Sequence, residues 1–523
     1  MTIHISENSL DLAHAHLLRF GDTDIFPKPF ELAVIDHEWD SIKDFVLDQD
    51  LDDWVTGAHR TCLCPKGRYS YRVATQLDPL DSLVFTALVV EIGGDLELFR
   101  VPSDLNVVHS WRFAASNDGS LYSKDFNWNS FLDRCRDLCA DPKNSYVVVT
   151  DIADFFRRIY HHRLEGALSV ATDRVEHRRG ILKLIKQWTD LASYGIPVGV
   201  SASRLLAEVV IDDVDKALLA EGTVYCRYVD DFRIFCTSKG EAYEKLALLA
   251  GLLDSNHGLA LQSGKTEILS VPAFSEKYLE PHSTTVLRSL AKNYREILDE
   301  IGVDDPYEEL RLGDLSPEIQ AEVKALNLES LMQEQLQKDQ IDLGLTTFLL
   351  RTLGQLNDAS LVNDLIAASE TLYPVLRDLV RYLGLLKLPS LSQTESIGHE
   401  LVNLLDSSVV SHLDYHRMWV LGLFAETAAW GQSNAFQKWS ARFSDDFSKR
   451  KLILARGRAG QDFWFRQHKN TFSNMDPWSR RAFLFGASCL PADEKKFWYS
   501  SVRRRLSVLE SAITRWVKTN PIA

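Results

Sequence analysis

Two adjacent aspartates, Asp230 and Asp231, interrupt a run of aromatic and β-branched residues at positions 225–235. Such residues are typical of strands, so the run predicts a hairpin that carries two carboxylates at its tip. A third carboxylate, Asp151, directly follows the apolar run 146–150, which predicts a buried central strand. Carboxylates grouped in this way can hold two divalent cations, which activate a hydroxyl nucleophile and stabilise a leaving pyrophosphate.

Each acid also has an ordinary structural interpretation. An Asp-Asp pair is common at hairpin turns, and Asp151 could simply cap the helix predicted after it. The two features together, separated by a helical stretch, favour a metal site. We predict that Asp151 and Asp230 bind metal directly and that Asp231 either binds metal or shapes the hairpin. The backbone carbonyl of Ile152 could complete the coordination.

Three further segments must position these acids. Pro197 and Gly199 predict a tight turn with close backbone approach, followed by a long amphipathic helix that ends near residue 219. Residues 243–253 predict another helix, and residues 258–269 predict two short strands, each preceded by a turn.

The order of these segments resembles motifs A to D of a reverse transcriptase palm, and the resemblance covers about residues 60–269. The four motifs are Asp-Ile-x-x-Phe-Phe at 151–156, Gly-Ile-Pro-x-Gly-x-x-x-Ser at 195–203, Tyr-Val-Asp-Asp at 228–231 and Lys-Thr-Glu-Ile-Leu at 265–269. Other segments resemble the bacterial abortive-infection (Abi) family of defence reverse transcriptases. These segments are 72–81, 110–113 and 161–164, together with 463–466 and 477–483 in the tail.

The resemblance implies roles for several residues beside the three acids. Lys265 would bind pyrophosphate or donate a proton to it, although an exposed turn lysine is an equal alternative. Phe156, rather than Phe155, would block the 2′-hydroxyl of the nucleotide and select deoxynucleotides; a core phenylalanine is the alternative. Pro197 and Gly199 would help to bind the substrate.

Basic residues of the expected fingers are candidates for the triphosphate, because guanidinium groups suit phosphate oxygens. The candidates are Lys66, Arg68, Arg72 and Arg112. Retroviral enzymes carry a glutamine after the proline of motif B, where this chain has Val198. Its loss weakens the expectation of faithful template reading.

Composition limits the remaining possibilities. The chain has 523 residues and a formal net charge of -15, which is unusual for a protein that follows a phosphate backbone. Its 7 cysteines lack the spacing of a zinc site and suit reduced thiols. No segment reaches the ~18 apolar residues of a membrane span, and residues 1–10 do not resemble a signal peptide. We therefore expect a cytoplasmic protein without membrane contact.

The predicted fold class is α+β, with three parts. Residues 1–130 form an N-terminal segment and fingers, with strand-like runs at 83–92 and 96–101; residues 131–280 form the palm. Residues 281–523 form a helical-repeat domain that resembles HEAT repeats, with an irregular bundle as the alternative. Its extended surface predicts homo-oligomers. Eight helices are expected, at 287–301, 317–335, 340–356, 360–383, 395–405, 412–430, 437–456 and 491–517.

These expectations describe an Abi-like DNA polymerase that uses two Mg²⁺ ions, with Mn²⁺ as a possible substitute, and acts in anti-phage defence. By resemblance it would join dNTPs without a template, start from a protein hydroxyl, and leave single-stranded DNA attached to the chain. A template-dependent enzyme that copies a cognate noncoding RNA, as retrons do, and a non-catalytic scaffold are the alternatives. The tyrosines considered as primers are Tyr69, Tyr71, Tyr122, Tyr373, Tyr382 and Tyr415.

Overall fold

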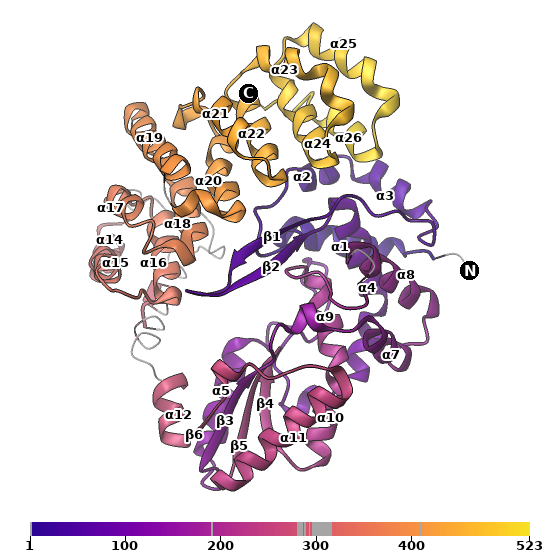
Figure 1. Ribbon diagram of the computed structural model, residues 1–523, viewed down its shortest axis with the longest axis vertical. Helices are drawn as coiled ribbons and strands as arrows, with labels where there is room; N and C mark the ends of the chain where they lie inside the picture. The colour runs from indigo at the N-terminus through magenta and orange to yellow at the C-terminus, as the bar shows by residue number, and fades with distance from the viewer. Residues whose placement is uncertain are drawn as a thin grey trace. The chain divides into compact units, whose positions relative to one another are not determined.

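The computed structural model describes residues 3–189, 192–279, 316–388, 390–407 and 409–522, with residues 286, 289–291 and 293–294. The chain divides into two compact units (Figure 1). The first unit comprises Met1–Thr61 and Ala74–Glu280, and the second comprises Cys62–Val73 and Pro281–Ala523. The short segment in the second unit is the outer part of a hairpin formed by β1 (Arg60–Pro65) and β2 (Tyr71–Gln76).

The first unit is built around a four-stranded antiparallel sheet with the strand order β4-β5-β3-β6. The expected central strand is confirmed as β3 (Tyr146–Asp151), and the expected hairpin is confirmed as β4 (Val224–Tyr228) and β5 (Asp231–Cys236). Strand β6 (Glu267–Ser270) pairs with the other edge of β3. Because β3 and β5 run in opposite directions, the end of one strand lies beside the start of the other.

Successive side chains along each strand point to opposite faces of this sheet, and both faces are covered by helices. Val147 and Val149 pack with Phe235 in a core that includes Phe131 of helix α5 (Trp128–Ala140) and Phe274 of α12 (Val271–Phe274). On the opposite face, α11 (Lys239–His257) contacts β3 and β5, and α10 (Asp212–Ala220) packs on α11 (Figure 1). The apolar, β-branched sequence of β3 follows from burial on both sides.

Residues 83–92 and 96–101, which the sequence predicts as strands, instead belong to the long helix α4 (Pro79–Phe99) and its C-terminal end. The strand prediction is wrong because a helix that is apolar all round carries no helical periodicity. Its start follows the usual rule, since the Asp78 side chain accepts the backbone N–H of Leu80 and Pro79 occupies the first turn. At Gly93, inside α4, a Cβ would lie 2.3 Å from the ring of Phe113, so this close packing requires a glycine.

The remaining elements of the first unit are mostly helices that surround the sheet and α4. The expected single helix after Gly199 is two helices, because Ile211 interrupts the helical backbone between α9 and α10. These elements are α1 (Glu7–Phe20), α2 (Glu31–His37), α3 (Trp39–Leu47), η1 (Ser103–Leu105), α6 (Phe155–Arg158), α7 (His161–Ala171), α8 (Val175–Trp188), α9 (Ser201–Val210), η2 (Ser263–Lys265) and η3 (Ser275–Leu279).

The described part of the second unit beyond residue 315 is helical, as expected. Most of its helices are shorter than the predicted ones, whereas the helix predicted at 395–405 extends over Leu391–Ser407. Asn327, in the left-handed conformation, divides the predicted helix 317–335 in two. Of the predicted helix 287–301, the structure describes only residues 289–291 and 293–294, and these are helical. The observed helices are α14 (Pro317–Ala325), α15 (Leu328–Leu336), α16 (Leu343–Gln355), α17 (Val362–Ala367), α18 (Leu376–Leu385), α19 (Leu391–Ser407), α20 (Asp414–Glu426), α21 (Ala435–Arg442), α22 (Asp446–Arg458), α23 (Asp462–His468), α24 (Pro477–Gly486), α25 (Ala492–Val502) and α26 (Val508–Trp516).

Alternate helices of this unit form one continuous row. Helix α16 packs on α18, α18 on α20, α20 on α22, α22 on α24, and α24 on α26. Each shared face is buried, for example at Leu421 and Leu484. Short 3-10 turns join several helices, namely η5 (Tyr373–Val375), η6 (Val409–His412), η7 (Ala428–Trp430), η8 (Lys469–Asn474), η9 (Ala487–Cys489) and η10 (Arg503–Arg505).

Two further properties concern the whole described chain. All seven cysteines are free thiols. Among the described helices, none combines the length and the apolar sequence that crossing a bilayer would require.

Candidate active site

The antiparallel pairing of β3 with β5 brings two of the three predicted acids together. Asp151 ends β3, Asp231 begins β5, and the two residues face each other in register. Asp230 lies one residue earlier, in the turn between β4 and β5. The third acid is tied to the same place, because the N–H of Ile152 donates to the carbonyl of Asp230 at 3.1 Å. The sheet register therefore joins acids that are about eighty residues apart in the sequence.

The turn itself has an unusual backbone. Val229 has a φ of 56°, in the left-handed region that β-branched residues rarely adopt. Such a conformation costs about 1–3 kcal/mol and persists only where the surroundings hold it. Because Val229 directly precedes Asp230, the conformation of its peptide sets the direction in which the acidic pair continues.

The Asp151 side chain is almost entirely buried, with 5% of its surface exposed. One carboxylate oxygen contacts the ammonium group of Lys265, which is half exposed. Within the described residues, the other oxygen, Oδ1, is buried without a hydrogen-bond donor. Burial lowers the pKa of Lys265, but the carboxylates of Asp151, Asp231 and Asp230 raise it by more, so the net shift is upward. The predicted motif D lysine thus lies within electrostatic reach of all three acids.

Asp231 has a basic partner on its own strand. Its Oδ1 lies 3.3 Å from Nη1 of Arg233, whose guanidinium also lies over the rings of Phe131 and Tyr278. The Asp231 side chain remains 30% exposed, so this pair leaves it accessible.

The donor set suits a hard divalent cation, which prefers oxygen ligands. Asp151 contributes a buried oxygen with no protein donor, and Asp231 stands opposite it on the next strand. Within the described residues, no three His, Cys, Asp or Glu side chains converge closely enough to form a ready-made metal cage. One carboxylate oxygen of Asp151 is directed toward the ammonium group of Lys265.

Two phenylalanines follow Asp151 and differ in burial. Phe155 is a core residue with 2% exposure, whereas Phe156 is only half-buried, and their rings contact edge to face. The carbonyl of Phe156 accepts the N–H of Ile196 at 3.0 Å, which joins it to the loop that contains Pro197 and Gly199.

The loop around Pro197 is held against the rest of the first unit. Gly199 has a φ of +104°, and a Cβ there would lie 2.9 Å from Cδ1 of Ile25. The N–H of Thr75 donates to the carbonyl of Val198 at 3.1 Å, at the end of strand β2. A glycine is therefore favoured at 199 by its backbone conformation, and a larger residue there would also have to displace the end of the Ile25 side chain.

The predicted triphosphate ligands lie in two different settings. Arg112 is buried, with its Nη1 3.0 Å from Oε1 of Glu97, so a phosphate would have to compete with this pair. Lys66, Arg68 and Arg72 belong to segment 62–73 of the second unit, where Lys66 is exposed. There Arg68 Nη2 donates to the carbonyl of Ile341 at 2.5 Å. Their roles in phosphate binding stay predictions.

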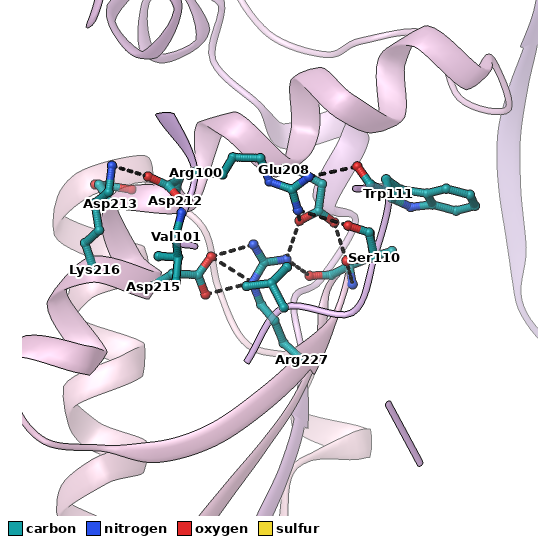
Figure 2. A network of polar contacts seen from close by, with 12 residues as sticks. Arg100, Val101, Ser110, Trp111, Glu208, Asp212, Asp213, Asp215, Lys216 and Arg227 are labelled. Atoms are coloured by element: carbon teal, nitrogen blue, oxygen red, sulfur yellow. Dashed lines mark hydrogen bonds and ion pairs between the residues drawn. The ribbon is translucent and has the colours of Figure 1, made fainter. Parts of the chain in front are cut away.

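A buried charged network next to the turn has no counterpart among the predicted site residues. Arg227 of β4 is fully buried and pairs with Glu208 of α9 and Asp215 of α10 (Figure 2). Ser110 donates to Glu208 at 2.6 Å. The sequence held one signal for this network, since Arg227 is a charge on a strand whose other side chains predict burial.

Comparisons with known proteins bear on this arrangement. Residues 108–307 match the family model described as reverse transcriptase (RNA-dependent DNA polymerase). The chain contains a reverse transcriptase domain. This domain includes Ser110, all three acids, Glu208, Arg227 and Lys265.

One curated relative and two solved structures give further context. The chain is 31% identical over 114 residues to the retron Ec73 reverse transcriptase of Escherichia coli, a match that covers 20% of this chain and 36% of the relative. It thus spans about a third of that relative's length. Telomerase from Candida albicans, in complex with a TWJ fragment of telomeric RNA, gives a TM-score of 0.32 at 10% identity, covering 68% of this chain and 69% of that one. Apo telomerase from Candida Tropicalis gives a TM-score of 0.32 at 12% sequence identity, covering 85% of this chain and 69% of that one.

Proposed function

We propose that this chain is a nucleotidyltransferase that polymerises deoxynucleotides at the site formed by Asp151, Asp230 and Asp231. The observation that carries the proposal is the register of Asp151 against Asp231 within a reverse transcriptase domain, with the ammonium of Lys265 beside them. The three carboxylates, with the carbonyl of Ile152, would hold two Mg²⁺ ions, for which Mn²⁺ could substitute. Bound there, the ions would supply charge neutralisation for the attacking and leaving oxygens.

The protein groups have separate tasks in this proposal. The backbone bond from Ile152 to Asp230 keeps the two strands in register, so that the carboxylates stay together. Lys265, which remains protonated because its pKa is raised, can donate a proton to the departing pyrophosphate or bind it. Phe156 would exclude the 2′-hydroxyl, a role for which its partial exposure suits it better than the buried Phe155.

Template copying is our first candidate for the reaction. It is supported by the match to a retron reverse transcriptase, within the 114 residues that align. The expected result is Mg²⁺-dependent incorporation of dNTPs whose product sequence follows an added RNA template with a DNA primer. The measurement is sequencing of the product made with two unrelated templates, and a chelator provides the metal-free control. If the purified chain incorporates no dNTP with or without template, the polymerase proposal is wrong.

Protein-primed synthesis without a template, in anti-phage defence, is the second candidate. The net charge of -15 and Val198 in place of glutamine favour it, together with the resemblance of several segments to Abi enzymes. Among the six tyrosines considered, Tyr69 is 85% and Tyr71 is 47% exposed. By contrast, Tyr122 and Tyr382 donate their hydroxyls to the carbonyls of Ser201 and Asp358. The Tyr71 hydroxyl donates to that of Tyr373 at 3.5 Å. A hydroxyl that starts a DNA chain must be accessible, so Tyr69 is the best of these candidates, followed by the half-exposed Tyr71.

The two candidates predict different products. After nuclease digestion, mass spectrometry would find a nucleotide phosphodiester on Tyr69 or Tyr71 if the chain primes itself, and changing that tyrosine to Phe would abolish the adduct. DNA that is free of protein and follows the template would contradict self-priming.

Sugar selection gives a separate prediction. Phe156→Ala should raise ribonucleotide use relative to deoxynucleotide use by about tenfold to a hundredfold, the range for one steric contact in a pocket. The measurement is the ratio of kcat/KM for the two sugars. Phe155→Ala is the matched variant: it should cost about 3–5 kcal/mol of stability through its core cavity while leaving the selection unchanged. If Phe155→Ala alone admits ribonucleotides, the wrong ring has been assigned.

We also propose that the helical unit is a HEAT-like solenoid. The continuous row from α16 through α18, α20, α22 and α24 to α26 supports this, because solenoid repeats contact mainly their neighbours.

A further inference from the structure

The left-handed turn before Asp230 is held by two side chains, one on each side of the Val229 residue. The N–H of Val229 donates to Oγ of Ser110 at 2.8 Å. Its carbonyl accepts a hydrogen bond from Nη1 of Arg227 at 3.0 Å. Ser110 and Arg227 are both fully buried. Both backbone polar groups of this strained residue are thus bonded to buried side chains, for which water is not available as an alternative partner.

The two side chains that hold Val229 meet on a single carboxylate. Oγ of Ser110 donates to Oε1 of Glu208 at 2.6 Å, and Nη1 of Arg227 lies 2.8 Å from Oε2 of the same residue. Glu208 is 1% exposed and comes from α9. Figure 2 shows Ser110, Arg227 and Glu208 converging from three different segments of the chain. Because the Ser110 hydroxyl donates its hydrogen to Glu208, its oxygen is free to accept the N–H of Val229.

Further buried groups fix the orientation of this triad. Asp215 accepts from Nε of Arg227 at 2.8 Å and from Nη2 at 2.5 Å, which holds the guanidinium plane. Nη2 of Arg100 donates to Glu208 at 2.9 Å and to the carbonyl of Ser110 at 2.9 Å. Burial lowers the pKa of Arg227, but Asp215 and Glu208 raise it by more, so Arg227 stays charged. Two arginines and two acids therefore compensate one another around the turn.

We propose that Ser110, Glu208 and Arg227 are positioning residues that hold the Val229 peptide in its left-handed conformation and thereby aim Asp230 and Asp231. None of the three reaches substrate or metal in this role. The catalytic consequence rests on the proposed polymerase function, whereas the clamp on Val229 does not. Glu208 also links the turn to the loop at Gly199, because this loop leads directly into α9, the helix that carries Glu208.

A double-mutant cycle tests the clamp. Ser110→Ala removes the acceptor for the Val229 N–H without adding or removing charge. Val229→Asn replaces a residue that resists the left-handed region with one that adopts it several-fold more readily. Ser110→Ala alone should lower kcat about tenfold with KM for dNTP within about twofold, because an interaction that orients the acids is lost while nucleotide binding is kept. In the Val229→Asn background the same substitution should lower kcat by no more than about threefold.

The matched control is Ser82→Ala on α4. Ser82 is also a fully buried serine of the first unit, and its hydroxyl has no hydrogen-bond partner among the described residues. Its removal should leave kcat within about twofold of the parent. An unchanged kcat in a folded Ser110→Ala protein would overturn the proposal. So would an equal loss in both backgrounds, because the serine would then act by a route other than the Val229 conformation.

The parent, Ser110→Ala, Val229→Asn and the double variant also give a readout that does not depend on activity. Ser110→Ala should lower the urea concentration at which the β4–β5 amides lose half of their protection from hydrogen exchange. In the Val229→Asn background, the same substitution should lower that concentration by less than half as much. If the parent chain polymerises nothing but the shifts are non-additive, the proposed function fails and the clamp stands. If the parent polymerises and the shifts and kcat effects are additive, the clamp fails and the function stands.

Discussion

Asp230→Asn should reduce deoxynucleotide incorporation about a thousandfold or more, because it removes a charge that two divalent cations require while nearly preserving shape. The bond from the Ile152 N–H to the Asp230 carbonyl is a backbone interaction and survives the substitution. The loss should therefore come from chemistry and not from unfolding. Asp151→Asn should behave alike, since its buried Oδ1 lacks a donor within the described residues.

The measurement is single-turnover incorporation at saturating dNTP and Mg²⁺, with circular dichroism to confirm folding. Asp254→Asn is the matched control: it is an exposed acid of α11 in the same unit, and its substitution should leave the rate within about twofold. Near-normal rates in folded Asp151→Asn and Asp230→Asn proteins would refute the assignment of the site.

Arg227→Met should destabilise the first unit by about 3–5 kcal/mol, the usual cost of removing one partner from a buried ion pair. Asp215 and Glu208 are 0% and 1% exposed, and both would lose the guanidinium group that they share. Methionine fills much of the space, so the loss should be mainly electrostatic. Arg227→Lys should fall between, because it keeps the charge and loses the planar fork that Asp215 accepts.

Hydrogen exchange of the β4–β5 amides in increasing urea measures this loss within the first unit. Arg136→Met is the matched control, since Arg136 pairs with Asp133 on the surface of α5, where both side chains are at least one-third exposed. That pair should contribute less than about 1 kcal/mol. Equal losses in Arg227→Met and Arg136→Met would mean that the buried network adds nothing to stability.

Local sequence pattern predicted the parts of the site that depend on neighbouring residues. The apolar run 146–150 and the strand-like residues around Asp230 gave β3 and the β4–β5 hairpin, because burial on both faces leaves its mark in consecutive positions. The same kind of evidence failed for α4, whose uniformly apolar sequence fits a buried strand and a buried helix equally well.

What the sequence by itself determined is the set of acids, their places at strand ends and the helical character of the tail. Only the tertiary structure decided that Asp151 faces Asp231, that Val229 is left-handed and that Ser110 and Glu208 hold it there with Arg227. The physical reason is that strand register and buried polar contacts join residues up to about a hundred and twenty positions apart. Such contacts are selected by packing and charge compensation in the folded chain, and they leave no periodic trace in the sequence.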